Sequence, residues 1–177
     1  RAAEKAFLDR IGVPVAPWRL VESESDLRDA VAELGLPAVL KTTRLGYDGR
    51  GQAVLREAAD LAPAFARLAP RPLILEAFVP FVAEVSAIAA RGADGAMAVF
   101  DPTENRHAHH ILDLSFAPAR VPAAVCDAAR AHVAAVAEGL EMVGLVALEM
   151  FLLPDGRLLG NEIAPRPHNS GHWTMDA

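Results

Sequence analysis

A short segment between two apolar runs combines glycines with basic side chains. Residues 41–52 read Lys-Thr-Thr-Arg-Leu-Gly-Tyr-Asp-Gly-Arg-Gly-Gln and separate the runs 38–40 and 53–55. The runs predict short buried strands, and Asp48 with Gly49 predicts a turn between them. Glycines let a backbone approach a ligand closely and point successive N–H groups at phosphate oxygens. The segment predicts a loop that covers a polyphosphate, and an exposed hairpin tip with solvated basic side chains is the alternative.

The setting of these glycines excludes two common phosphate-binding loops. A Walker loop needs the pattern Gly-x-x-x-x-Gly-Lys-Ser/Thr at the start of a helix, and a Rossmann loop needs Gly-x-Gly-x-x-Gly opening a helix after a strand. Here the loop joins two strands, and Lys41, Arg44 and Arg50 supply its positive charge. The loop is therefore a different kind of phosphate cover, whose meaning depends on the rest of the chain.

A second pattern lies in the last hairpin that the sequence predicts. Asp155 and Gly156 are typical of a tight turn between two strongly apolar stretches, residues 145–153 and 157–163. A two-residue turn at this place puts Glu149 directly opposite Glu162. Asn161 takes the facing position if the turn has three residues, and the two glutamates never meet if one points to solvent.

Two glutamates facing each other on a half-buried sheet need a joining group. Directly opposed side chains have Cβ atoms about 4.5–5.5 Å apart, at which distance like charges repel. A cation, a proton or an arginine is able to join them. A hard divalent cation is the natural choice, since Mg²⁺ binds one or two carboxylates together with substrate phosphates. Asn161 is able to add a neutral oxygen. The phosphate-covering loop and this pair together indicate ATP.

The hydrophobic periodicity predicts the elements that hold these residues. Helices are expected at 3–11, from the Ser23–Asp26 capping box to residue 34, at 58–68 and at 121–138. Strands are expected at 18–21, 38–40, 53–55, 73–76, 85–91, 96–100, 145–153 and 157–163. The segments 104–110 and 164–177 are expected to be polar loops. The first half therefore reads β-α-β-β-α-β, which is typical of a helix layer on a small sheet.

The helix at 121–138 should bury one apolar stripe. Its expected members are Val125, Ala129, Val133, Val136 and Leu140. His132 on the same helix is expected at the surface.

Composition narrows the class of protein. The 177 residues carry a formal net charge of −6, which argues against a general nucleic-acid binder. No apolar run is long enough to span a membrane. The one cysteine, Cys126, excludes an internal disulfide and fits a cytoplasmic protein. The chain opens on Arg1, and we expect it to be a piece of a longer protein.

Several motifs together resemble the ATP-grasp superfamily. They are Lys41, the loop Gly46 to Gln52, Glu76-Ala77-Phe78-Val79, Glu84-Val85-Ser86 and Asn161-Glu162-Ile163-Ala164-Pro165-Arg166. The run from Asn161 to Trp173 narrows the resemblance to the family of 5-(carboxyamino)imidazole ribonucleotide synthases, and the resemblance covers nearly the whole chain. It implies an α+β ATP-grasp fold, with two α+β lobes whose antiparallel sheets enclose a nucleotide cleft. The implied parts are a leading helix at 1–12, a small lobe with the glycine-rich lid at 13–78, and a large lobe with the metal and acceptor site at 79–177.

The resemblance also implies which residues bind ATP and metal. The implied ATP contacts are Lys41, Gly46, Tyr47, Asp48, Gly49, Arg50, Gly51, Gln52, Glu76, Ala77, Phe78, Val79, Glu84, His107, Asn161 and Glu162. In this family the lysine and the loop hold the phosphates, residues 76–79 line the adenine pocket largely through backbone groups, and Glu84 bonds the ribose. Glu149 and Glu162 match the ligands of Mg²⁺ or Mn²⁺. Arg166, His168 and Asn169 match the catalytic region that receives bicarbonate and aminoimidazole ribonucleotide.

The implied reaction is a carbon–nitrogen ligation in purine biosynthesis. ATP phosphorylates bicarbonate, and the resulting carboxyphosphate, or CO₂ released from it, carboxylates the amine of aminoimidazole ribonucleotide. The resemblance also implies a homodimer of the longer protein and low activity of this piece alone. Two rival readings are a sibling ligase that activates formate or an amino acid, and a non-catalytic nucleotide-binding module.

The sequence departs from the family pattern at two places. Leu45 stands where the family often has a glycine, and His109 with His110 stands where it usually has Asp-Gly. A metal site of His107, His109 and His110 is an alternative to polar loop residues, but no cysteine or carboxylate spacing supports it. His172 and Trp173 are either neighbours of the catalytic residues or part of the packing of the loop, and packing is favoured for Trp173.

Overall fold

The computed structural model describes residues 1–44, 51–109 and 111–175. They form two compact units, the first made of Arg1–Lys5 and Ala16–Val79 and the second of Ala6–Val15 and Pro80–Ala177. The division falls within the first helix, α1 (Ala2–Arg10). Each unit contains helices and an antiparallel sheet, which confirms the expected α+β class.

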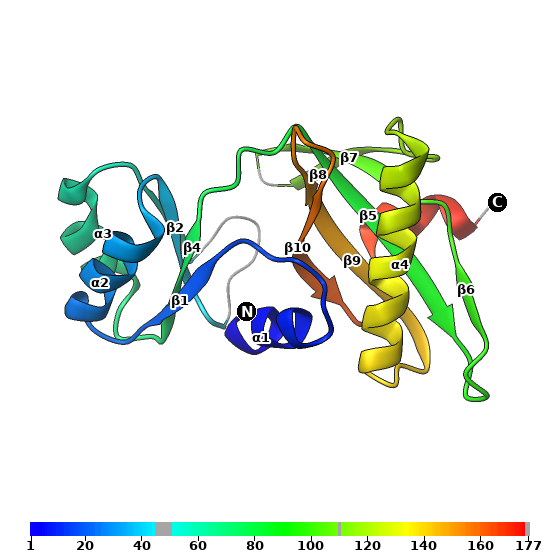
Figure 1. Cartoon of the computed structure of the whole chain (residues 1–177), viewed down its shortest axis with the longest axis horizontal. Coiled ribbons are helices and arrows are strands. Elements are labelled where there is room, and N and C mark those ends of the chain that lie inside the picture. The colour runs from blue at the N-terminus through cyan, green and yellow to red at the C-terminus, as the bar shows by residue number, and fades with distance from the viewer. Residues whose placement is uncertain (45–50, 110, 176–177) are drawn as a thin grey trace. The chain divides into compact units, whose positions relative to one another are not determined.

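A four-stranded sheet forms the centre of the first unit. Its order is β1-β4-β2-β3, with β1 at Trp18–Val21, β2 at Ala38–Thr42, β3 at Gln52–Leu55 and β4 at Leu73–Ala77. Helices α2 (Glu24–Leu34) and α3 (Leu61–Leu68) lie side by side against the sheet (Figure 1). The β-α-β-β-α-β order expected from the sequence is confirmed.

The period of the strands decides which side chains meet the helices. Leu40 and Leu75 are fully buried in the core with residues of α2 and α3. Successive residues of a strand point to opposite faces, so Lys41 and Glu76 lie on the face that these helices do not cover. Removing the apolar side chains from water stabilises the unit by about 1.5–3 kcal/mol for each large residue. Because the apolar side chains are buried under α2 and α3, Lys41 and Glu76 are held on the opposite face of the sheet.

Local sequence chemistry sets the ends of the first unit's helices. Ser23 accepts a hydrogen bond from the Asp26 N–H, and the Asp26 carboxylate accepts one from the Ser23 N–H, so the predicted capping box is confirmed. The helix predicted at 58–68 is divided, because it begins as the 3₁₀ turn η1 (Ala58–Asp60) before α3.

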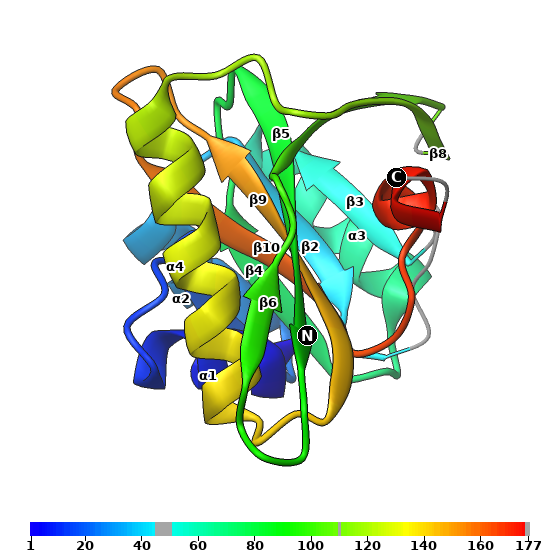
Figure 2. The same ribbon diagram turned by 90° about the vertical axis from the view of Figure 1, so that its right-hand side faces the viewer.

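The second unit is built on a six-stranded sheet. Five strands follow the order β10-β9-β5-β7-β8, and β6 pairs with β5. The strands are β5 at Ala83–Arg91, β6 at Met97–Val99, β7 at Thr103–Ala108, β8 at Ile111–Phe116, β9 at Gly144–Leu152 and β10 at Leu158–Ala164. Helix α4 (Ala123–Gly139) runs along one face of β5 and β9 (Figure 2).

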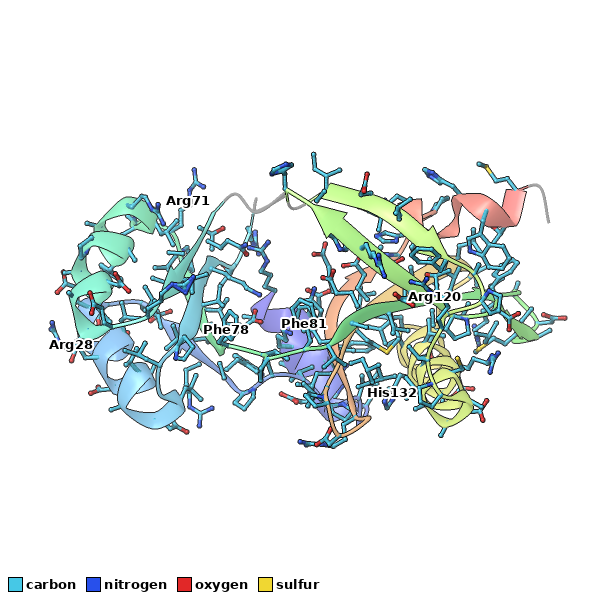
Figure 3. All side chains as sticks on the ribbon, turned by 90° about the horizontal axis from the view of Figure 1, so that it is seen from above. Arg28, Arg71, Phe78, Phe81, Arg120 and His132 are labelled. Carbon is cyan, nitrogen blue, oxygen red and sulfur yellow. The ribbon has the colours of Figure 1, made fainter. Side chains whose placement is uncertain are left out.

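The core between α4 and the sheet assigns a face to each strand residue. Val85, Ala87, Leu148 and Met150 are buried in this core. The alternate residues of β5 and β9 therefore point to the face away from α4. Near one end of that face, the ring of Phe81 stacks on Phe151 with centroids 4.6 Å apart (Figure 3 labels Phe81).

Two of the loop predictions for the second unit are wrong. The segment 104–110 lies largely in β7, which pairs with β8 as a hairpin. Its pattern hid the strand because Thr103 and Asn105 are buried by hydrogen bonding to each other and to neighbours, without apolar side chains. The segment 164–177 contains the 3₁₀ helix η2 (Asn169–Met175), whose short turns leave no apolar period in the sequence.

The buried residues of helix α4 agree with the predicted stripe except at the end of the helix. Four of the five predicted stripe residues are buried, but Leu140 is 41 % exposed, so its inclusion was wrong. The helix ends at Gly139, and Leu140 is its cap residue, beyond the last residue of the helix. His132 is half-buried rather than at the surface, and burial lowers its pKa below the ordinary value.

Two further findings bear on the class of protein. Cys126 is a free thiol on α4. Within residues 1–44, 51–109 and 111–175, no helix has the length and apolar character needed to cross a membrane.

Candidate functional site

The last hairpin brings Glu149 and Glu162 directly opposite each other, as predicted. The predicted turn is nevertheless wrong, because the Leu153 N–H donates to the Arg157 carbonyl at 2.9 Å and leaves a three-residue turn. A bulge at Asn161, between Gly160 and Glu162, compensates for the longer turn. In a bulge of this kind two residues oppose one on the partner strand. Asn161 therefore stands beside the pair, and Glu162 keeps the facing position.

The two carboxylates lie on the face of the second unit's sheet that α4 does not cover. Glu149 also pairs with Ser86 of β5, and its side chain is 21 % exposed, while Glu162 is exposed. No cluster of three histidine, cysteine or acidic side chains able to hold a metal occurs in the described part of the chain. Two opposed carboxylates with open access fit Mg²⁺, which completes its shell with water and phosphate oxygens.

Glu84 and His107 form a direct pair on the same face. The His107 Nδ1 lies 2.6 Å from a carboxylate oxygen of Glu84, and each side chain is about one quarter exposed. The pair joins β5 to β7, whose register sets Glu84 opposite Asn105. Two residues that the resemblance placed at the nucleotide are thus brought together by the sheet.

A buried amide fixes the strands under this pair. The Asn105 amide donates to the Ser86 hydroxyl, and its carbonyl oxygen accepts from the hydroxyls of Ser115 at 2.8 Å and Thr103 at 3.3 Å. Asn105 is 4 % exposed and bonds at both ends of its amide. Buried polar groups satisfied in this way rigidify their surroundings, so the network holds β7 in place beside Glu84.

His168 connects the segment after β10 to the carboxylate pair. Its Nδ1 accepts from the Ser170 N–H and lies 2.8 Å from the Ser170 hydroxyl, while its Nε2 lies 3.3 Å from Glu149 Oε1. This arrangement assigns the proton to Nε2, which donates to the carboxylate. Burial, with the nearby charge of Arg166 and the neighbouring His107 and His172, lowers the pKa of His168 below its ordinary value. The ring is neutral at neutral pH.

The other residues of the predicted acceptor region differ in their surroundings. Arg166 is exposed and donates to the Pro167 carbonyl at 2.9 Å, and the Asn169 carbonyl oxygen accepts from the Ser170 N–H at 3.0 Å. Trp173 makes an edge contact with Phe100 at 6.2 Å, in agreement with the packing role predicted for it. The guanidinium of Arg166 is planar and has further N–H donors beside the one that bonds Pro167, which suits an oxyanion.

In the first unit, Glu76 binds two lysines. Its Oε2 lies 2.9 Å from the Lys41 Nζ and 3.5 Å from the Lys5 Nζ. Burial, the largest influence, acts to raise the pKa of Glu76, but the two lysines outweigh it and lower that pKa below the ordinary value. Glu76 is therefore a carboxylate, and Lys41, with 14 % of its side chain exposed, is the more accessible of the two lysines.

In the segment Glu76–Val79, two backbone N–H groups donate hydrogen bonds to loop carbonyls and one does not. The Ala77 N–H donates to Pro17 at 2.9 Å, and the Phe78 N–H donates to Pro37 at 3.2 Å. The Val79 N–H makes no backbone hydrogen bond within the described residues. The segment is thus anchored at two successive residues, and the adenine contact that the resemblance implied stays a prediction.

Most of the glycine-rich loop lies outside the described residues. This applies to Gly46, Tyr47, Asp48, Gly49 and Arg50, and also to Leu45 and His110. The loop's far end is described, where Gly51 has a φ of +71° and its carbonyl accepts from the Thr42 N–H at 2.8 Å. Gln52 then pairs with Lys41 across β3 and β2, as expected for a loop between two strands.

Sequence reasoning missed two contributors to these sites. Lys5 is 2 % exposed and contacts Glu76, and Ser170 is fully buried and bonds His168. A sign of Lys5 was present, because a charged residue three positions before Leu8 falls on the buried stripe of a helix. Ser170 left no such sign, since it lies in a 3₁₀ turn that the sequence did not predict.

Comparison with known proteins identifies the family of the chain. The model of the ATP-grasp domain family matches residues 6–177. The chain is 47 % identical over 179 residues to N5-carboxyaminoimidazole ribonucleotide synthase of Brucella melitensis, and this match covers all of the chain and 49 % of that protein. A solved ADP complex of an N5-carboxyaminoimidazole ribonucleotide synthetase has a TM-score of 0.94 at 47 % identity, covering all of the chain and 47 % of that structure.

A third relative was solved with a nucleotide and a ribonucleotide bound. It is the N5-carboxyaminoimidazole synthase of Aspergillus clavatus in complex with ADP and 5-aminoimidazole ribonucleotide, with a TM-score of 0.87 and 29 % identity over 98 % of the chain and 45 % of that structure. The chain thus spans about half the length of the relatives it matches. Since the family model matches nearly all of its residues, the chain belongs to the ATP-grasp domain family.

Proposed function

We propose that the chain binds ATP with Mg²⁺ or Mn²⁺ and serves the ATP-dependent carboxylation of 5-aminoimidazole ribonucleotide with bicarbonate. The observation that carries this proposal is the register of Glu149 opposite Glu162, because two directly opposed carboxylates on one face of a sheet suit a divalent ion that also binds phosphate. The similarity to N5-carboxyaminoimidazole ribonucleotide synthases along the whole chain supports the choice of reaction.

The contacts with the nucleotide follow the motifs of the family resemblance. Lys41 contacts the phosphates, and the segment Glu76–Val79 receives the adenine through its backbone. Glu84 accepts from the ribose hydroxyls while His107 holds its carboxylate in place. The glycine-rich residues 46–52 are proposed to cover the phosphates. The proposed bounds of the parts remain 1–12, 13–78 and 79–177.

The metal ligands are Glu149 and Glu162, with Asn161 beside them. A divalent ion held there would neutralise the charge of the transferring phosphoryl group. The protein's own task is to align a bicarbonate oxygen with the γ-phosphorus. Arg166 binds the bicarbonate oxyanion through its planar guanidinium. His168 is neutral, and its Nε2–H orients the Glu149 carboxylate toward the ion.

The proposed reaction has two steps. Bicarbonate oxygen attacks the γ-phosphorus, the bond to the β-phosphate oxygen breaks, and ADP and carboxyphosphate form. The amine of the ribonucleotide next attacks the carboxyl carbon, directly or after CO₂ is released; a carbon–nitrogen bond forms, inorganic phosphate leaves, and the amine loses a proton. Asn169 and His168 are proposed to contact this second substrate, as the family resemblance implies.

Two broader features are also proposed. A homodimer of the whole protein is proposed from the family resemblance alone. A cytoplasmic location is proposed because the reaction uses ATP and the one cysteine forms no disulfide.

The test is release of inorganic phosphate from ATP by the protein, with each substrate added in turn. We expect release that requires Mg²⁺ and bicarbonate and is coupled to the ribonucleotide. Release that responds to formate or an amino acid in place of bicarbonate would support a sibling ligase. ATP binding without any turnover would contradict the proposed reaction and support a non-catalytic module.

A further inference from the structure

Lys5 is among the most deeply buried charged side chains of the described residues. It lies on α1 with 2 % of its surface exposed, outside every nucleotide-binding motif of the sequence. Burial lowers its pKa below the ordinary value, although Glu76 acts to raise it. Burying a charge is costly, and an apolar side chain of similar volume would fill such a position at a smaller cost in folding free energy. A lysine here therefore calls for a reason beyond packing.

The contacts of Lys5 indicate what that reason is. Its Nζ lies 3.5 Å from Glu76 Oε2, the same oxygen that accepts from the Lys41 Nζ at 2.9 Å. The second oxygen, Glu76 Oε1, is buried and has no hydrogen-bond partner within the described part of the chain. The carboxylate is thus held through one oxygen, and the two lysines compete for it.

This sharing sets how much positive charge Lys41 can present. Lys5, Lys41 and Glu76 together carry a formal charge of +1, and without Lys5 they would carry none. A carboxylate paired with Lys41 alone would neutralise that lysine toward any approaching anion. With Lys5 present, part of the Glu76 charge is already compensated, so Lys41 keeps an attraction for phosphate.

We propose that Lys5 is a positioning residue for the triphosphate of ATP, which acts through Glu76 on Lys41 and does not touch the nucleotide. Lys5 is too buried to reach a ligand, whereas Lys41 is partly exposed. The inference rests on the proposed function, since it takes ATP as the ligand of Lys41. It adds a role for α1, to which that proposal assigns no part in binding.

Equilibrium binding of two ligands tests the proposal. ATP carries the triphosphate, and adenosine shares its base and ribose without charge. In Lys5→Met we expect the Kd for ATP to rise about tenfold, because one unit of compensating charge near the phosphates is lost. The Kd for adenosine should stay unchanged. A purely structural role of Lys5 would weaken both ligands alike.

Two further variants isolate the route through Glu76 and Lys41. The double variant Lys5→Met/Glu76→Gln leaves Lys41 as the charged member of the trio, so it should regain most of the ATP affinity lost in Lys5→Met. In a Lys41→Met background, Lys5→Met should have no further effect on ATP, because the group it acts on is gone. Circular dichroism checks that each variant folds. If Lys5→Met does not fold, Lys5→Gln removes the charge while keeping a donor toward Glu76.

The outcomes separate this inference from the proposed function. Wild-type protein that fails to bind ATP would overturn both. Wild-type protein that binds ATP, with a Lys5→Met variant of equal ATP affinity, would overturn the role of Lys5 alone. Equal weakening of ATP and adenosine would also overturn it. Selective weakening of ATP with recovery in the double variant would support it.

Discussion

Glu149 stands directly opposite Glu162 in a register that the bulge at Asn161 restores after a three-residue turn. The two acidic side chains therefore share the face of the sheet away from α4, where a divalent ion and phosphate oxygens can reach them. The relationship makes the metal role of the pair open to a direct test.

Glu162→Gln should leave the fold intact and lower Mg²⁺-dependent ATP hydrolysis by about a hundredfold or more, because the loss of one anionic ligand removes several kcal/mol of charge stabilisation. Phosphate release measured across Mg²⁺ concentrations checks this. Glu138→Gln, at an exposed position of α4, serves as the matched control and should hydrolyse ATP like the wild type. Unchanged hydrolysis in Glu162→Gln would remove the metal role.

Glu76→Gln should lower the free energy of unfolding by about 3 kcal/mol, since it removes the charge that compensates two lysines in a buried setting. Urea unfolding measures the change. Glu33→Gln is the control, because Glu33 pairs with Arg19 where both side chains are about half exposed, and such pairs contribute less than about 1 kcal/mol. Similar losses in the two variants would mean that Glu76 contributes no more to the free energy of unfolding than an exposed ion pair does.

The stability of the second unit should depend on pH through His132. Burial lowers its pKa in the folded state, so the unfolded chain binds the proton more readily. The stabilisation is present above the unfolded pKa of about 6.5 and is lost as the pH falls below it. Urea unfolding between pH 8 and pH 5.5 should show a smaller decline in His132→Gln than in the wild type. An identical decline would contradict the predicted contribution.

Gly171→Ala should displace η2 from the sheet, because a Cβ at this position would overlap the Cδ1 of Ile88 on β5. The expected cost is about 1 kcal/mol, as the far end of the isoleucine can shift in part. In an Ile88→Val background, which lacks that methyl group, the same glycine substitution should cost close to nothing. Thermal unfolding of the four proteins in this cycle checks the coupling, and equal costs in both backgrounds would refute the overlap.

The same Gly171→Ala variant should also raise the KM for aminoimidazole ribonucleotide more than the KM for ATP. The reason is that η2 carries Ser170, which holds His168 in the proposed acceptor region. Steady-state kinetics with each substrate varied in turn measures this. A larger change in the KM for ATP would place η2 on the nucleotide side.

The sequence by itself determined the order of the first unit, the capping box of α2, the α+β class and the family resemblance. The order of elements and the capping box follow from local rules, since strand and helix periods, cap residues and turn residues act within a few positions of one another. The α+β class came from the resemblance of the motifs to a known family. The sequence also led to the Glu149–Glu162 pair, although by way of a turn one residue too short.

Tertiary structure decided what local rules could not reach. The β7–β8 hairpin was missed because Asn105 is buried with its amide donating to Ser86 and its carbonyl oxygen accepting from Ser115, whereas the sequence shows only a polar residue. The bulge at Asn161 depends on the partner strand, and the meeting of Lys5 with Glu76 joins residues 71 positions apart in the sequence. Long-range packing and shared charge, which leave no period in the chain, fixed these parts of the candidate site.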